Sequence, residues 1–230
     1  MTADANQSFL VRSFEPGDRP KIREISCATA FHGALPERTR RIDCRLLADL
    51  LTCYYTDFEP ESILVAESGG RVVGYITGAV STRTFSRTML RLILSKTIPG
   101  ILLGRYRINS RVLVLLAVLL AGAVKGERDP DLEEEYPAHL HINIDDEYQQ
   151  SGLGSKLMTA WLQCLEEKQV KGAHLSTNST NEGAIRFFRR FGFQRCRRYR
   201  STFWSFVYGR PVQVEIFSRK LPRNSLSGFV

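Results

Sequence analysis

Apolar residues recur along the chain with two different periods, which predict a mixture of strands and helices. The strand-like segments are Phe9 to Arg12, Ser62 to Glu67, Val72 to Gly78, Ala138 to Ile144, Ala173 to Ser176, Gln194 to Phe206 and Val212 to Leu221. The helix-like segments are Pro20 to Ala30, Asp43 to Tyr54, Gly154 to Lys168 and Asn181 to Arg190. Strands that alternate with helices predict an α/β fold with a mixed, partly parallel sheet.

One hairpin is predicted from its turn residues. The pair Gly69-Gly70 separates two strand-like segments, and glycine tolerates the positive φ that a tight hairpin turn needs at both positions. We therefore expect the segments on either side of this pair to be adjacent antiparallel strands.

The stretch from about Ser81 to Glu135 departs from this pattern. It holds a basic, partly apolar run interrupted by Pro99-Gly100, then the apolar run 111–124, then a cluster of acidic residues. We expect a helical insertion between two sheet strands, of the kind that builds a substrate pocket or a dimer contact. A spanning helix needs roughly 20 apolar residues, so we expect a buried helix or the flank of a pocket and no membrane span.

Composition adds a charge argument and a redox argument. The 230 residues carry a formal net charge of +8, which favours a phosphorylated cofactor, an acidic membrane surface or nucleic acid, unless it is only a solvated basic surface. Nothing resembles a zinc finger or an arginine-rich tail, so we expect no specific nucleic acid. The five cysteines are scattered without a Cys-x-x-Cys pair, and the polar N-terminus lacks a secretory core. We therefore expect reduced thiols in a cytoplasmic protein.

The most informative segment is the loop from Gln149 to Gly154, which joins the strand-like segment ending at Ile144 to a helix. Amides at the N-terminus of a helix lack intrahelical partners, and the helix dipole adds positive charge there, so such a loop binds anions. An ordinary glycine turn is the alternative. A Walker loop is disfavoured because Gly154-Ser155-Lys156 has the wrong order, and a dinucleotide fingerprint because Leu157 replaces its third glycine.

This segment resembles the GNAT superfamily of CoA-dependent N-acetyltransferases. Gln149, Gly152 and Gly154 match that family's Gln/Arg-x-x-Gly-x-Gly/Ala signature, and the run from Asn181 to Gly192-Phe193 matches its Asn-x-x-Ala helix. The resemblance covers 72–78 and 138–193. The run from Pro137 to Ile142 also resembles the acetyltransferase-like domain attached to some O-GlcNAc hydrolases.

The resemblance implies one GNAT-like domain over 1–230, with a cofactor-binding core at about 137–193 and a sheet splayed open between Ile142 and Leu175. It implies acetyl-CoA as co-substrate, with its pyrophosphate on the loop amides and its pantetheine arm along the preceding strand. The implied cofactor-binding residues are Ile142, Asn143, Ile144, Gln149, Gln150, Ser151, Gly152, Leu153, Gly154, Ser155, Asn181 and Phe188.

The candidate bases lie on the strand before the loop. His139, His141 and Asn143 share one face by the two-residue period of a strand. Histidine titrates in the range useful for amine chemistry, so His141 is the first candidate and His139 the second, unless both are structural. No third ligand at metal-binding spacing is evident, so we expect no metal.

The proton donor for the leaving thiolate is less evident. Phe188 occupies the position at which the family often has a tyrosine, and phenylalanine cannot donate a proton. Tyr136, Tyr148 and Tyr199 are the other options, or the thiolate leaves unassisted, since its conjugate acid has a pKa near about 8.5.

The sequence therefore predicts an N-acetyltransferase that moves an acetyl group to a primary amine of a small molecule or peptide by direct attack in a ternary complex. The alternatives are an inactive CoA-binding or protein-interaction module of the same fold and, from the charge, a nucleic-acid-associated protein. The last strands and the apolar insertion could support a homodimer.

Overall fold

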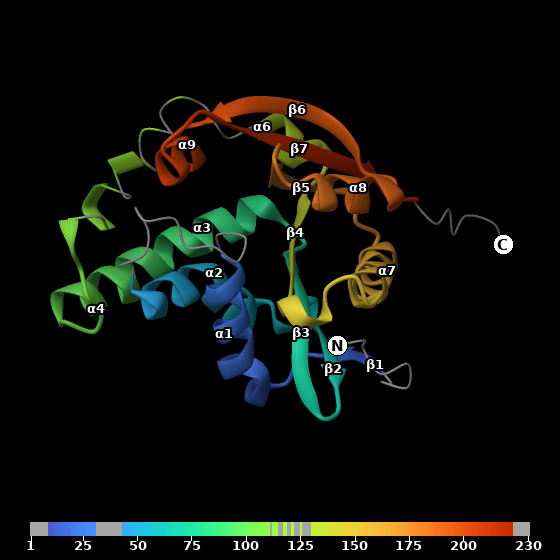
Figure 1. Ribbon diagram of the computed structural model, residues 1–230, viewed down its shortest axis with the longest axis horizontal. Coiled ribbons are helices and arrows are strands. Elements are labelled where there is room, and N and C mark those ends of the chain that lie inside the picture. Colours follow the sequence, from blue (N-terminus) through green and yellow to red (C-terminus); the bar gives the residue numbers. More distant parts are fainter. Residues whose placement is uncertain are drawn as a thin grey trace, which may run out of the picture.

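The computed structural model describes residues 9–30, 43–110, 112–114, 117–118, 121, 125 and 130–222 (Figure 1). Its strands form one mixed sheet in the order β1-β2-β3-β4-β5-β7-β6. The strands are β1 (Phe9–Ser13), β2 (Leu64–Ser68), β3 (Arg71–Ala79), β4 (Ala138–Ile144), β5 (Gly172–Asn178), β6 (Gln194–Ser201) and β7 (Val212–Lys220). Only β4 and β5 are paired in parallel, and the other neighbours run antiparallel.

Helices lie on both faces of this sheet. They are α1 (Arg19–Thr29), α2 (Cys44–Phe58), α3 (Thr82–Leu92), the π-helix η3 (Ile93–Thr97), α4 (Ile98–Leu102), α6 (Pro130–Glu135), α7 (Leu153–Glu167), α8 (Glu182–Arg190) and α9 (Thr202–Tyr208). Three short 3-10 turns are η1 (Pro16–Asp18), η2 (Pro60–Ser62) and η4 (Asp146–Tyr148). Figure 1 shows α1, α2 and α3 on one side of β3 and β4, with α7 and α8 on the other.

Each face of the sheet has its own hydrophobic core because strand side chains alternate between the faces. Leu140, Trp161 and Phe217 belong to the larger cluster, which joins the sheet to α7 and α8. Tyr55 and Tyr75 belong to the second cluster, which joins the opposite face to α1 and α2. The polar face of β4 therefore points toward α1 and α2.

The mixed sheet with flanking helices that the sequence predicts is confirmed, as is the hairpin at Gly69 and Gly70, whose φ angles are +55° and +77°. The prediction of one strand from Gln194 to Phe206 is wrong beyond Ser201. There the chain turns into α9, because the Ser201 side chain accepts a hydrogen bond from the Trp204 amide and caps a helix that ends at Gly209.

The insertion begins as a helix and packs on α2. Ser81 caps α3, and the hydroxyl of Tyr106 donates a hydrogen bond of 2.6 Å to the carboxylate of Asp49. Val112 is buried beside Tyr106, whereas Leu113 is exposed; much of the apolar run 111–124 lies outside the described residues. Within the described part of the chain, the search for a helix long and apolar enough to span a bilayer finds none.

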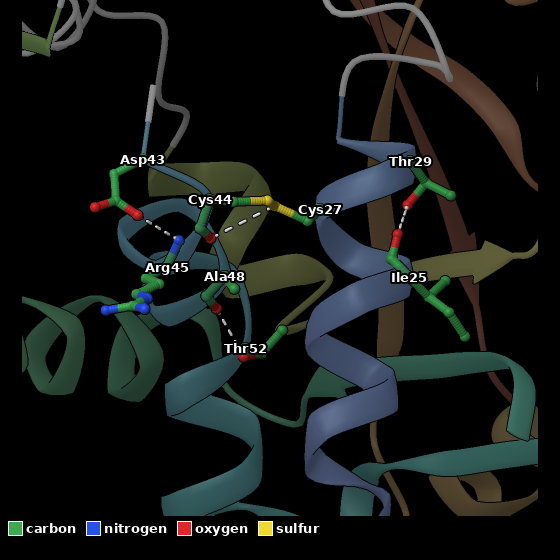
Figure 2. Close-up of a disulfide and its surroundings, with 8 residues drawn as sticks. All are labelled: Ile25, Cys27, Thr29, Asp43, Cys44, Arg45, Ala48 and Thr52. Carbon is green, nitrogen blue, oxygen red and sulfur yellow. Dashed lines mark hydrogen bonds between the residues drawn. A yellow bond between two sulfur atoms is a disulfide. The ribbon is translucent and has the colours of Figure 1, made fainter. Parts of the chain in front are cut away.

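Two cysteines correct the prediction of reduced thiols. Figure 2 shows Cys27, near the end of α1, bonded to Cys44 at the start of α2, with their Cα atoms 6.0 Å apart. The bond ties together two helices whose connection, 31–42, lies outside the described residues. The remaining cysteines, Cys53, Cys164 and Cys196, are free thiols.

Gly78 is the position in the sheet where a side chain fits least. A Cβ atom there would lie 2.3 Å from the carbonyl oxygen of His139 and 2.4 Å from Trp161. We expect Gly78→Ala to lower the free energy of unfolding by about 2 kcal/mol or more, since β3 must move away from β4 and α7. Urea denaturation measures this change.

Gly17→Ala is the matched control, because nothing lies within 4 Å of the added methyl group. We expect the control to remain within about 0.5 kcal/mol of the wild type. Equal stability of the two variants would contradict the tight packing at Gly78.

Candidate functional site

The centre of the sheet is split. β4 and β5 pair only at Ala138↔Ala173 and His139↔His174, and then diverge. On its other edge β4 stays paired with β3 as far as Ile144, while β5 stays paired with β7 as far as Asn178. One backbone edge of β4 beyond His139 is therefore open, as the sequence resemblance implies.

The loop after β4 presents amide groups that the protein does not use. Gln150 and Gly152 both have positive φ, at 61° and 87°, and a backbone of this kind can turn successive amides toward one side. No side chain caps α7, and none of the described residues accepts a hydrogen bond from the amides of 150–154. Because the helix dipole adds positive charge at this end, these amides form a site for an anion.

The glycines of this loop have different tasks. A Cβ atom on Gly152 would meet nothing within 4 Å, so it is the positive φ of this residue that favours glycine. A Cβ atom on Gly154 would lie 3.3 Å from Ile144 and 3.4 Å from Phe187, so this glycine lets α7 approach β4 and α8. The side chain of Leu153 is fully buried and anchors the first turn of α7.

A cavity of about 420 Å³ lies along the open edge of β4. It is lined by Thr29, Ile142, Asn143, Ile144, Asp146, Gln149, Thr180, Asn181 and Tyr208. The cavity thus brings together five of the residues predicted from the sequence, contributed by β4, the loop and the start of α8. Phe188 is not among them: it is buried in the core, where its ring packs on Phe193.

Side-chain hydrogen bonds fix the walls of this cavity. The amide of Asn143 donates to the hydroxyl of Tyr75 at 2.9 Å, and its oxygen lies 2.9 Å from the hydroxyl of Thr29 at the end of α1. Asn181 caps α8 by accepting from the Ala184 amide at 3.1 Å. Gln149 donates to Asp146 at 2.6 Å. The polar walls are therefore held before any ligand enters.

His139 has both ring nitrogens engaged. Nε2 lies 2.8 Å from the hydroxyl of Tyr55, and Nδ1 lies 2.8 Å from the hydroxyl of Thr82. In either tautomer one nitrogen donates and the other accepts, so no lone pair is left for a substrate proton. Burial lowers the pKa of His139 well below its ordinary value, and the nearby His141 and His174 lower it further.

His141 differs from its neighbour. The residue is exposed, and it lies two residues before Asn143 on the same face of β4. The surrounding protein and, to a smaller extent, the nearby His174 lower the pKa of His141 to about 4. The ring is therefore neutral at pH 7 and accessible.

Within the described residues, no three His, Cys, Asp or Glu side chains are grouped as a metal site.

Tyr208 is one of four cavity residues that the sequence analysis missed; the others are Thr29, Asp146 and Thr180. Tyr208 lies at the end of α9, in a segment expected to be strand and turn. The signal was present: Ser201 is a good cap, and Gly209 is a good helix end seven residues beyond the first helical position. Burial raises the pKa of Tyr208, so its hydroxyl keeps its proton near neutral pH.

The comparisons with known proteins agree with this geometry. Residues 109–195 match the model of the acetyltransferase (GNAT) domain. A search of curated protein sequences finds no match. The domain match covers both the loop 149–154 and α8, and so confirms the GNAT resemblance found in the sequence.

Solved structures extend the likeness to nearly the whole chain. The crystal structure of SsHAT is 26% identical with a TM-score of 0.69, over 94% of this chain and 100% of that one. The yncA structure from Salmonella typhimurium with its cofactor acetyl-CoA is 15% identical (TM-score 0.58; 96% and 99% covered). The ribosomal-protein-S18-alanine N-acetyltransferase from Escherichia coli is 14% identical (TM-score 0.54; 97% and 100% covered). The GNAT-like fold class is confirmed.

The state of His139 predicts how stability depends on pH. In the unfolded chain this histidine is protonated at about pH 6.5, whereas in the folded chain it is protonated only at lower pH. The contribution of His139 to stability is therefore present above about pH 6.5 and is lost as the pH falls below it. Between pH 7 and 5 we expect the free energy of unfolding to fall, because the unfolded chain binds a proton at His139 that the folded chain does not bind.

Urea denaturation at the two pH values, in the wild type and in His139→Gln, isolates this contribution. The raised pKa of Glu59 acts in the opposite direction, but it is present in both proteins. We expect the pH-dependent loss to be smaller in the variant. An identical loss in both proteins would mean that His139 is protonated in the folded state.

Proposed function

We propose that this chain, which carries the fold of the GNAT acetyltransferases, is an acyl-CoA-dependent N-acetyltransferase that moves an acetyl group from acetyl-CoA to a primary amine. One observation carries the proposal: unused amides at residues 150–154 stand at the mouth of the split between β4 and β5. A helix N-terminus of this kind binds phosphate, and the open edge of β4 can pair with an amide-bearing chain.

These residues divide the binding of acetyl-CoA among them. The pyrophosphate binds to the loop amides, and the pantetheine amides pair with the open backbone edge of 142–144 as an added strand does. Asn181 contacts the arm or the phosphates from the opposite wall. The thioester then lies toward the split, where β4 and β5 separate.

The reaction needs a neutral amine, a polarised thioester carbonyl and an acceptor for the amine proton. A free ammonium has a pKa near about 10, so a base with a pKa of about 4 cannot deprotonate it in advance. The amine therefore binds in its neutral form. After attack, the nitrogen bonded to the former carbonyl carbon is far more acidic, and the neutral ring of His141 takes the proton then.

Thr77 supports this role of His141. It is paired with His141 across β3 and β4, so the two side chains share a face. Its hydroxyl is buried and, among the described residues, has no hydrogen-bond partner. This hydroxyl can therefore orient the ring of His141.

Tyr208 is the proposed proton donor for the departing thiolate. It lines the cavity with Ile142 and Asn143, and its raised pKa keeps the donor protonated. Phe188, at the family's usual tyrosine position, has no acidic proton and is buried in the core. The proposed donor of this chain therefore lies on α9, whereas the family's usual tyrosine position lies on α8.

The acceptor is proposed only as a class, a primary amine of a small molecule or peptide. One neighbour is named for the alanine of a ribosomal protein, and only the amine chemistry is carried over from it. A homodimer and a cytoplasmic location remain predictions. Disulfides are rare in the cytosol, so the Cys27–Cys44 bond makes the location worth measuring by cell fractionation.

Two substitutions of Gly152 test the proposal through acetyl-CoA binding. Asp and Asn have nearly the same shape and differ in charge. We expect Gly152→Asp to weaken acetyl-CoA binding at least about tenfold in calorimetry, because a carboxylate at the amides repels the pyrophosphate. We expect Gly152→Asn to bind close to the wild type, since Asn tolerates positive φ.

Equal affinities for the two variants would contradict the assignment of the pyrophosphate to this loop. Failure of the wild type to bind acetyl-CoA would overturn the proposed function. Binding without transfer to any amine of a broad panel would leave the inactive CoA-binding module as the function.

The two proton carriers are tested by kinetics. We expect His141→Ala and Tyr208→Phe each to lower kcat about 100-fold, with little change in acetyl-CoA affinity. The kcat/KM of the wild type should not fall near pH 6.5 through protonation of His141, because the pKa of His141 is about 4. The matched control is His139→Gln, which should retain most of its turnover. Unchanged kcat in His141→Ala would remove this residue from the reaction.

A further inference from the structure

The insertion presents an apolar row that the protein leaves in water. Leu90, Leu94, Ile98 and Leu102 follow one another at intervals of four residues along α3, η3 and α4, and their exposed fractions are 58%, 58%, 41% and 81%. Leu103, directly after Leu102 at the end of α4, is 85% exposed. An exposed row of this kind on a soluble domain usually marks an interaction surface.

The π-helix keeps these side chains aligned. In an α-helix, residues four apart drift by about 40° around the axis, so a row at this interval would wind around the helix. A π turn holds more residues per turn, so over η3 (Ile93–Thr97) the drift is in the opposite sense. Because Leu94 to Ile98 spans η3, the drifts on its two sides are partly cancelled.

The row is not needed to hold the insertion on the protein. The opposite face of α3 supplies Phe85, Met89 and Leu92, which pack in the core with Tyr55 and Tyr75. The root of the helix is fixed by Thr82, whose hydroxyl lies 2.8 Å from His139. Figure 1 shows α4 at the far end of this arm, away from α7 and α8. The arm is thus anchored at the candidate site and exposed along its length.

The net charge of the protein is concentrated in the same segment. Eight of the 32 Lys and Arg residues lie within 81–126, and none of the 24 Asp and Glu residues does. These eight are Arg83, Arg87, Arg91, Lys96, Arg105, Arg107, Arg111 and Lys125. The rest of the chain is formally neutral, so the charge of +8 is carried by residues 81–126, a segment that includes α3, η3 and α4.

On α3 the basic and apolar residues share the outward face. Arg83, Arg87 and Arg91 are exposed and also recur at intervals of four, so they lie beside Leu90 and Leu94. A long arginine side chain can lay its methylene groups along an apolar surface and keep its guanidinium in water. Leucines flanked by arginines are typical of helices that lie in a membrane interface.

We propose that α3, η3 and α4 form an arm that docks the protein on an anionic lipid surface. The arginines are attracted to the acidic headgroups, and the row from Leu90 to Leu102 enters the boundary between headgroups and acyl chains. The arm lies on the bilayer and does not cross it. Since Thr82 contacts His139, docking holds the candidate site close to the membrane. Nucleic acid satisfies only the charges, because its phosphates give the leucines no apolar surface.

Sedimentation with lipid vesicles tests this proposal independently of any transferase activity. We expect the wild-type protein to sediment with phosphatidylcholine vesicles that contain phosphatidylserine, and to remain in solution with phosphatidylcholine alone. Binding should weaken as salt rises from about 0.1 M to 1 M, because the headgroup attraction is screened. Leu90→Ser with Leu94→Ser should lower the partition coefficient at least about tenfold, as should replacing Arg83, Arg87 and Arg91 by Gln.

Two matched controls come from exposed residues elsewhere. Leu10→Ser with Leu51→Ser removes two exposed leucines outside the arm, and replacement of Arg45, Arg71 and Lys171 by Gln removes the same charge. Both controls should partition within about twofold of the wild type. All variants change exposed side chains, and thermal unfolding verifies that each is folded.

Three results would overturn the proposal. One is failure of the wild type to sediment with the acidic vesicles. Another is an equal loss of binding in the controls and the arm variants, which would make the binding a property of net charge alone. The third is tight binding to duplex DNA or to an acidic protein, unaffected by the leucine changes, together with no binding to vesicles. None of these results depends on acetyl-CoA, so the proposed function stands or falls separately.

Discussion

The early end of the pairing between β4 and β5 is the constraint around which the site is built. A parallel pair normally satisfies the backbone of both strands, yet here pairing stops after His139↔His174. β5 continues against β7 and β4 against β3, so the sheet stays continuous at one end while its centre opens. The open edge of 142–144 then has backbone groups to offer a ligand, and the amides of 150–154 stand at the end of the same edge.

Two histidines on one face of β4 show how neighbouring residues decide the chemistry of identical side chains. His139 and His141 differ by one step of the strand period and both rings contact Tyr55, but it is His139 whose two nitrogens are hydrogen-bonded to Tyr55 and Thr82. Loss of hydration lowers both pKa values. His139 is therefore a neutral structural group, whereas His141 keeps an accessible nitrogen. A neutral base serves acyl transfer after the amine has attacked and not before.

The insertion carries charged and apolar surface that the packed sheet does not have to accommodate. The formal charge of +8 is carried by 81–126, and a row of exposed apolar residues lies on α3, η3 and α4 within that segment. An exposed apolar row is an aggregation hazard when it stands alone, and the repulsion among the arginines beside it opposes self-association. The arm is joined to the body through Thr82 and Tyr106, so its position is linked to both His139 and α2.

The sequence by itself determined the features that depend on residues adjacent in the chain. The glycine hairpin, the glycine-bearing loop before α7, and α7 and α8 themselves follow from turn residues, helix termini and periodicity, and the structure agrees with them. Even α9 had a readable cap and end at Ser201 and Gly209. Only the tertiary structure decided that Cys27 meets Cys44, and that Tyr208, not Phe188, lines the cavity. Those outcomes depend on contacts between residues far apart in the chain, which local pattern and spacing do not record.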